Sequence, residues 1–167
     1  MRRAWFLALA LLAAPGLAAA DEPSGCGGFK WPVDHERAAL SNPDKPAVAN
    51  GGALAFGAAA ALKLMPLADA GLPSAPERAP KSPRSFAGHF TLAAPAKPGV
   101  HKITISSAAW IDVIDGGKYL RPMGFTGATD CEGARKSVKF DLPPRPTTIQ
   151  FSGVASGQIS VIVTPGD

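Results

Sequence analysis

The 167-residue sequence contains few of the residues from which catalytic and metal centres are built. It has two cysteines and three histidines, and no Cys-x-x-Cys spacing that would indicate a metal-binding or redox pair. It has no Gly-x-Ser-x-Gly segment, so the nucleophile turn of the α/β-hydrolases is excluded. It also has no recognisable calcium loop. The sequence therefore predicts neither a cofactor nor a catalytic or metal-binding residue.

Aromatic and basic side chains are too scattered to indicate a nucleic-acid surface. Tryptophan occurs three times, tyrosine once and phenylalanine eight times, and no basic cluster is interleaved with them. The formal net charge of +4 includes Arg2 and Arg3 of the N-terminal segment. Without that segment, 15 basic residues remain against 13 acidic ones, which is a net charge of +2. We therefore predict no nucleic-acid partner.

The N-terminus has the three-part pattern of a secretory signal. Two arginines precede an apolar run over residues 4–12, and Ala18 and Ala20 form the small-residue pattern that a signal peptidase accepts. This order predicts a signal peptide over residues 1–20 and a periplasmic or secreted chain that begins near Asp21. The apolar run is shorter than the ~20 residues of a membrane span, so we predict no stable membrane insertion.

The two cysteines, Cys26 and Cys131, are the remaining feature with a direct chemical consequence. An even number of cysteines in an oxidising compartment favours a disulfide, and we predict a Cys26–Cys131 bridge. Residues 21–167 have the length of one domain, and we predict a single β-sandwich domain over that range.

Short stretches of alternating apolar and polar residues fill the chain after residue 85. Glycine and proline separate them, and this pattern predicts an all-β fold, an antiparallel β-sandwich that is jelly-roll-like. Gly116-Gly117 predicts a two-residue hairpin turn. The expected strands cover residues 86–92, 100–106, 109–115, 118–121, 137–142, 147–152 and 158–164.

The first half of the chain has a less regular pattern. Asp34–Leu40 is a candidate for a short N-terminal helix, because Asp34 is a suitable N-cap and Glu36 lies in the first turn. Ala60–Met65 is predicted to be a strand. Residues 70–85 contain four prolines and are predicted to form an extended surface loop.

Two resemblances to known groups rest on short segments. Gly99–Ser106 and Trp110–Lys118 resemble the central strands of pre-peptidase C-terminal β-sandwich modules. That resemblance implies a secreted, non-catalytic module that accompanies or binds other domains. Cys26–Val33, Ala109–Val113 and Cys131–Val138 resemble a group of small secreted proteobacterial proteins of unknown function.

Some members of the second group carry the label homogentisate 1,2-dioxygenase, which implies an enzyme with a non-haem iron site. Such a site is built from two histidines and one carboxylate. No segment here matches the motif of that dioxygenase family, so no site residue is carried over from it. An iron site in this chain requires two of His35, His89 and His101 to converge with a carboxylate. This iron enzyme is the alternative function.

A ligand-binding face is the principal functional prediction. Carbohydrate-binding sandwiches use aromatic platforms beside polar groups, and the predicted hairpin and the segment before Cys131 contain both kinds of side chain. We therefore predict a non-catalytic binding or accessory module for an envelope or extracellular ligand, with carbohydrate as a candidate. Trp110 is equally suited to the core, and Asp112 and Asp115 point to opposite faces of a strand. The candidate ligand face comprises Trp110, Asp112, Tyr119, Arg121, Asp130 and Glu132.

Overall fold

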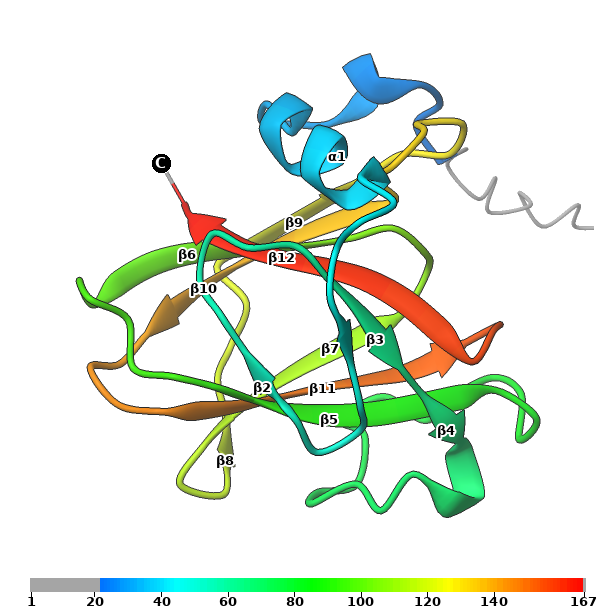
Figure 1. The fold of residues 1–167 in the computed structure, drawn as a ribbon, viewed down its shortest axis with the longest axis vertical. Coiled ribbons are helices and arrows are strands. Elements are labelled where there is room, and N and C mark those ends of the chain that lie inside the picture. The colour runs from blue at the N-terminus through cyan, green and yellow to red at the C-terminus, as the bar shows by residue number, and fades with distance from the viewer. Residues whose placement is uncertain (1–21, 167) are drawn as a thin grey trace, which may run out of the picture.

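Two six-stranded sheets packed face to face make up the body of the protein (Figure 1). The computed structural model describes residues 22–166, so the predicted signal peptide, residues 1–20, lies outside the described residues. The all-β sandwich predicted from the alternating pattern is confirmed. Within residues 22–166, no helix has the length and apolar character needed to cross a membrane.

Sheet I is the upper layer in Figure 1, and its strand order is β1-β3-β12-β6-β10-β9. All its neighbouring strands are antiparallel except the parallel pair β1–β3 at one edge. Its strands in spatial order are β1 (Ala47–Val48), β3 (Ala60–Lys63), β12 (Gln158–Pro165), β6 (Gly99–Ile105), β10 (Lys136–Leu142) and β9 (Gly124–Gly127).

Sheet II is the lower layer, with the order β2-β5-β11-β7-β8 and with β4 also paired to β5. The β2–β5 pair is parallel, so both sheets are mixed: they are antiparallel apart from the edge pairs β1–β3 and β2–β5. Its strands are β2 (Ala53–Leu54), β5 (Phe86–Leu92), β11 (Thr147–Val154), β7 (Trp110–Asp115), β8 (Lys118–Tyr119) and β4 (Met65–Pro66).

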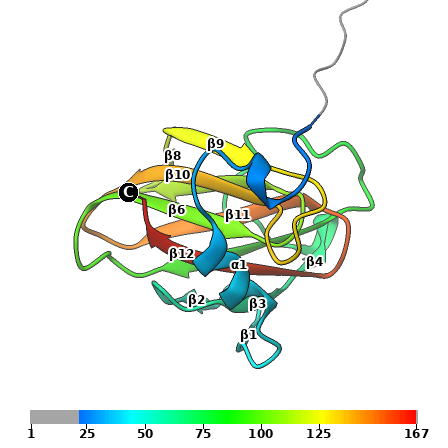
Figure 2. The same cartoon turned by 90° about the horizontal axis from the view of Figure 1, so that it is seen from above.

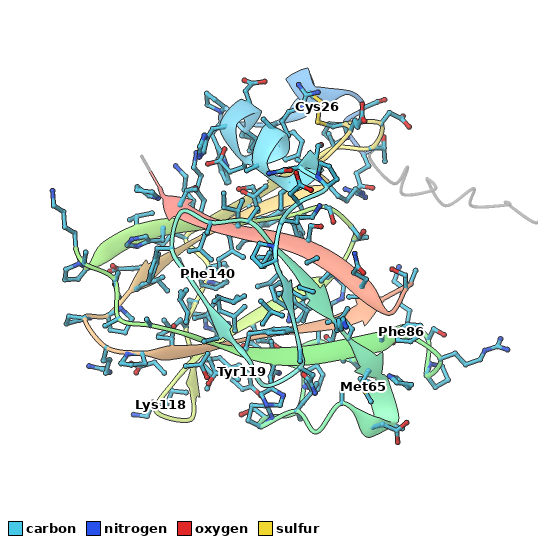
Figure 3. The ribbon with its side chains drawn as sticks, in the orientation of Figure 1. Cys26, Met65, Phe86, Lys118, Tyr119 and Phe140 are labelled. Atoms are coloured by element: carbon cyan, nitrogen blue, oxygen red, sulfur yellow. A yellow bond between two sulfur atoms is a disulfide. The ribbon has the colours of Figure 1, made fainter. Side chains whose placement is uncertain are left out.

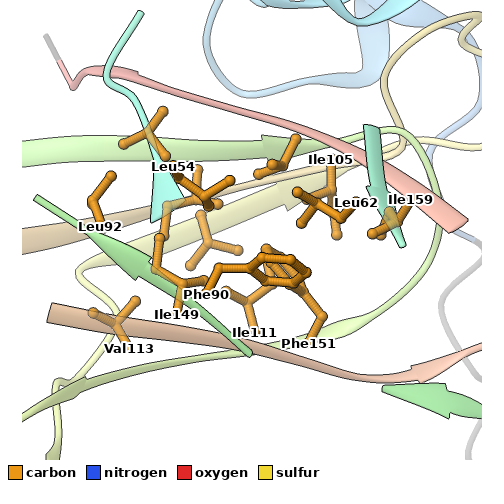
Figure 4. Packing of buried hydrophobic residues seen from close by; sticks show 14 of the residues in the cluster. Leu54, Leu62, Phe90, Leu92, Ile105, Ile111, Val113, Ile149, Phe151 and Ile159 are labelled. Atoms are coloured by element: carbon orange, nitrogen blue, oxygen red, sulfur yellow. The ribbon is translucent and has the colours of Figure 1, made fainter. Parts of the chain in front are cut away.

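The core lies between the sheets and consists of the inward-facing half of each alternating stretch (Figure 4). Phe90 of β5 and Phe151 of β11 are fully buried, and their ring centroids are 6.1 Å apart. Phe140 of β10 enters the same layer from sheet I, as Figure 3 shows. The period-2 prediction therefore identified the faces of these strands correctly, because side chains i and i+2 of a strand share a face.

The predicted hairpin forms between β7 and β8, where Ile114 pairs with Tyr119 and Asp115 with Lys118. Gly116 and Gly117 have φ values of 54° and 81°, which L-residues with side chains rarely adopt.

The strand predicted over residues 60–65 is divided between the two sheets. β3 ends at Lys63 in sheet I, and β4 begins at Met65 in sheet II, so the chain crosses between the layers at Leu64. Gly88 of β5 lies against this crossing and leaves room for the leucine side chain, since a Cβ there would lie 2.8 Å from Leu64 Cδ2.

The N-terminal segment covers the outer face of sheet I, where the predicted helix forms as α1 (Asp34–Ser41) and packs on β12 (Figure 2). Short 3₁₀ turns occur at Cys26–Gly28 and Leu67–Asp69. Glu36 of α1 is buried, accepts a 2.7 Å hydrogen bond from Thr164 Oγ1, and lies 3.2 Å from Lys102 Nζ. Burial raises the pKa of Glu36, but the hydrogen bonds and the Lys102 charge outweigh that effect and leave the pKa lowered.

The predicted Cys26–Cys131 disulfide is present and joins residues 105 positions apart. It attaches the start of the described chain to the connection between β9 and β10 (Figure 3). Backbone hydrogen bonds reinforce this attachment: Gly25 N donates to Thr129 O, and Thr129 N donates to Pro23 O, both at 2.8 Å.

The Pro-rich segment of residues 70–85 contains no helix or strand, as predicted for an extended loop. Two buried polar side chains on the outer face of sheet II, Asp112 and Gln150, fasten it to the sandwich. Gln150 Nε2 donates to Ser74 O at 3.1 Å, and Asp112 Oδ2 accepts from Glu77 N at 3.3 Å.

Candidate functional site: a cleft between the sheets

One flank of the sandwich is open. The outermost strands there are β9 of sheet I and β8 of sheet II, which lie along the same side of the molecule (Figure 2). Phe125 of β9 pairs with Val138 of β10 and therefore shares its inward face. Sheet II does not cover Phe125, because β8 is only two residues long, and Phe125 remains 65% exposed.

The uncovered space is a cavity of about 480 Å³, which we call the intersheet cleft. Most of its lining is apolar and comes from both sheets and from the N-terminal segment. The apolar lining residues are Pro23, Gly28, Ala108, Ala109, Trp110, Ile111, Leu120, Pro122, Phe125, Gly127 and Val138.

Lys136 of β10 brings a positive charge into the cleft from an inward-facing position. Its Nζ donates a 3.0 Å hydrogen bond to Ala109 O and lies 5.4 Å from the centre of the Trp110 ring. The guanidinium of Arg78, from the Pro-rich loop, lies 5.6 Å from the centre of the same ring. Burial lowers the pKa of Lys136, and the charges of Arg78 and Arg135 lower it further.

Two other cations and two carboxylates complete the charged lining, and Thr126 adds a hydroxyl group. Lys30 Nζ lies 5.4 Å from the centre of the Phe125 ring. Arg135 forms an ion pair with Glu22, and its hydrogen bond and charge lower the pKa of Glu22. Glu77 lies 3.8 Å from the guanidinium of Arg121, which is outside the cleft. The lining therefore has four basic and two acidic side chains.

Trp110 is the one predicted ligand-face residue that lines the intersheet cleft. Its indole Nε1 donates to Asp112 Oδ1 at 2.7 Å. Asp112 is 3% exposed, and its other oxygen accepts from Gln150 Nε2 at 3.0 Å. Trp110 and Asp112 are two positions apart on β7 and share its outer face, so this hydrogen bond fixes the orientation of the indole beside the carboxylate.

The other four predicted ligand-face residues lie outside the cleft. Tyr119 donates its hydroxyl to Ala75 O, and Arg121 pairs with Glu77, so both contact the Pro-rich loop. The predicted pair Asp130 and Glu132 flanks the disulfide. Asp130 Oδ2 accepts from Ser24 Oγ at 2.9 Å, and Glu132 O accepts from Arg37 Nε at 3.3 Å. These contacts attach the N-terminal segment and α1 to the β9–β10 connection.

The residues that give the cleft its character were not predicted from the sequence. Phe125 lies between Gly124 and Thr126 in β9, and the sequence around it has no apolar–polar alternation that would predict a strand. Lys136 did have a signal, because it continues the inward-facing series of Val138, Phe140 and Leu142. A cation in phase with core positions indicates either a buried ion pair or an opening in the core.

The three histidines are placed in different parts of the fold. His35 is exposed on α1, and His89 is on the outward face of β5. His101, near the start of β6, contacts the Phe56 ring with ring centres 5.2 Å apart. In the described part of the chain, no three His, Cys, Asp or Glu side chains are grouped so that they could hold a metal ion. The iron site of the alternative function therefore lacks a fitting ligand set among residues 22–166.

Asp115 does not form a carboxylate pair with Asp112. Asp115 accepts from Arg145 Nε at 2.7 Å, and this hydrogen bond, with the Arg145 charge, lowers its pKa despite partial desolvation. Asp112 is bound to Trp110 and Gln150 instead. The two carboxylates therefore have separate structural roles, as their odd spacing on β7 predicts.

The fold and the cleft together define a disulfide-bonded β-sandwich with an open, apolar and net-basic intersheet site. Comparisons with protein-family models, with curated proteins and with solved structures found no match to this chain. The function is therefore inferred from the geometry and chemistry of the cleft.

Proposed function

We propose that this protein is an exported, non-catalytic binding module that takes a small ligand into the intersheet cleft. The observation that carries the proposal is the 65% exposure of Phe125 at an inward-facing position of a sandwich strand. Burial of apolar surface is worth ~25 cal/mol per Å², so a ligand that covers this ring and the adjacent lining binds favourably. A cavity of about 480 Å³ lies within the usual range for small-molecule sites, ~300–1,000 Å³.

Export to the periplasm or the exterior is part of the proposal. The Cys26–Cys131 disulfide fits a protein that folds outside the reducing cytoplasm. The predicted signal peptide over residues 1–20 and its cleavage near Asp21 supply the route.

The chemistry of the lining favours binding over catalysis. Nucleophilic or acid–base catalysis needs a nucleophile and a base within hydrogen-bond reach of each other. The described lining contains two carboxylates, and each is close to an arginine: Glu22 to Arg135 and Glu77 to Arg121. The aromatic rings and cations provide contact surface and charge recognition instead.

The test is a ligand-observed NMR screen of apolar, charged and carbohydrate fragments against the exported protein. Phe125→Ala is expected to weaken the binding of cleft ligands at least ~10-fold, since it removes the exposed ring. Met123→Ala is the matched control, because Met123 is 62% exposed two residues away and does not line the cleft. Equal losses in the two variants would contradict a site at Phe125.

A second variant tests the cleft without removing any contact. Ala108 lines the cleft and is exposed, so Ala108→Phe places a ring in the cavity without disturbing the core. We expect this variant to melt at the wild-type temperature and to bind no fragment. Retained binding, or a dimer in light scattering that protects Phe125, would show that the cleft is not a small-molecule site.

A further inference from the structure

We propose that the ligand of the intersheet cleft is a small amphipathic carboxylate; this inference rests on the proposed function. In this assignment the carboxylate group binds Lys136 and Arg78 beside Trp110, and the apolar body covers Phe125, Leu120 and Val138. The assignment combines the charge, the hydrogen-bonding capacity and the apolar surface of one cavity.

The charge of the cleft is unbalanced beside Trp110. Lys136 and Arg78 flank the same ring, at 5.4 and 5.6 Å from its centre. Among residues 22–166, no carboxylate lies within 4.0 Å of either cation, whereas the nearby Arg135 has Glu22 as its partner. An anion placed between the two cations relieves their mutual repulsion and is attracted to both.

Lys136 has hydrogen-bond donors left for that anion. A lysine ammonium has three N–H groups, and one of them donates to Ala109 O. Lys136 is half-buried on the inward face of β10, so its remaining N–H groups have limited access to water. Arg78, on the exposed Pro-rich loop, adds a planar guanidinium that can bind a carboxylate through two N–H groups.

The remaining lining selects the rest of the ligand. Leu120 packs against the hydrophobic core, and Val138 and Ile111 belong to it, so they form an apolar floor next to Phe125. An apolar chain or ring is therefore better suited to this part of the cleft than a sugar, which would leave hydroxyl groups without partners. A carboxylate carries a single charge, and its desolvation costs less than that of a phosphate dianion.

The experiment compares ligands with the same chain and different head groups by isothermal titration calorimetry. Octanoate is anionic, octanol neutral and octylamine cationic, and octyl phosphate tests the alternative anion. Hydrogen bonds to charged groups contribute ~1.5–3 kcal/mol, so octanoate is expected to bind ~10–100-fold more tightly than octanol. Octylamine is expected to bind more weakly than octanol.

Lys136→Met keeps most of the apolar stem and removes the charge. It is expected to bring the affinity for octanoate down to that for octanol, with the affinity for octanol unchanged. Lys118→Met, on the exposed β7–β8 hairpin, is the control and is expected to alter neither affinity. Arg78→Met is the second variant. Arg78 lies on an exposed loop, so a folding defect would not explain a loss of affinity in this variant.

Each outcome separates the inference from the function on which it rests. Equal affinity for octanol and octanoate, with both lost in Phe125→Ala, would overturn the carboxylate assignment and leave a binding module. Preferential binding of octyl phosphate or octylamine would also overturn it. A cleft that binds none of these compounds and no fragment in the NMR screen would overturn the proposed function itself.

Discussion

The two flanks of the sandwich both carry short edge strands, but the sheets end differently there. On the flank of β3, β4 and β5, the chain passes directly from sheet I to sheet II at Leu64. Leu62 and Leu64 are 0% and 6% exposed there. On the flank of β9 and β8, the chain crosses from sheet II to sheet I through the longer connection of residues 120–123, and Phe125 is 65% exposed at an inward-facing position.

The difference shows that an inward-facing side chain becomes core only where the opposite sheet reaches it. The crossing at Leu64 closes one flank, and the missing side chain of Gly88 lets the leucine approach β5. The connection from β8 to β9 contains Pro122 and follows a strand of two residues, so sheet II ends before it covers β9. One flank therefore contributes stability, and the other provides a cavity.

The largest expected effect is the difference in stability between two phenylalanine truncations, one in the covered core and one on the open flank. Phe151→Ala removes a fully buried ring and is expected to lower the free energy of unfolding by about 3–5 kcal/mol. Phe125→Ala removes a mostly exposed ring and is expected to change it by at most ~0.5 kcal/mol. Urea unfolding followed by circular dichroism measures both, and a comparable loss in Phe125→Ala would show that the second flank is closed in solution.

The next effect concerns the disulfide, which holds the N-terminal segment against the open flank. Replacing Cys26 and Cys131 together by serine is expected to cost about 2–4 kcal/mol of unfolding free energy. It is also expected to weaken ligand binding, because Pro23, Gly28 and Lys30 line the cleft from the attached segment. Unfolding and calorimetry on the same sample separate the two effects. A variant as stable as the wild type would leave the backbone hydrogen bonds at Thr129 as the main attachment.

The smallest expected effect is a pH dependence of stability at Lys136 on the open flank. The pKa of Lys136 is lowered in the folded protein from its ordinary value of 10.5, so the folded state binds this proton less tightly than the unfolded state does. The protonated ammonium therefore costs stability at neutral pH, and the cost falls as pH rises from the lowered pKa towards 10.5.

The free energy of unfolding of Lys136→Met should therefore increase less than that of the wild type as pH rises within this alkaline window. Relative to Lys136→Met, the wild type is expected to become more stable as pH rises, by less than either effect above. Lys118→Met, at an exposed lysine, is the control and should follow the wild type. Parallel stability curves for wild type and Lys136→Met in urea unfolding would contradict a desolvated ammonium.

Much of the fold was predictable because the strands and the hairpin turn depend on short-range sequence patterns. The alternation in residues 86–92 and 137–142 identified inward faces, and Gly116-Gly117 identified the hairpin turn. The helix near Asp34 formed as predicted, but Asp34 is not its N-cap: Val33 takes that position without a side-chain cap hydrogen bond, and Asp34 and Glu36 are the acidic residues of the first turn. The edge strands were not predictable, because Gly124–Gly127 is a strand only through its pairing with β10. A four-residue segment between two glycines carries no periodic signal of its own.

The candidate site was predictable only in its aromatic component. Trp110 was selected for its aromatic side chain and its place before the hairpin, and it lines the cleft. Asp130 and Glu132 were selected for their polarity near Cys131, but their contacts attach the N-terminal segment instead. Proximity in sequence was a poor guide, because the cleft is assembled from segments as distant as Glu22 and Lys136.

The sequence by itself determined the all-β class, the pairing of its two cysteines and the faces of its main strands. These depend on composition and on a period-2 pattern that local chemistry imposes. Only the tertiary structure decided that one flank closes at Leu64 while the other leaves Phe125, Trp110 and Lys136 around a cavity. The physical reason is that solvent exposure depends on whether another part of the chain covers a residue, and sheet II ends too early to cover β9.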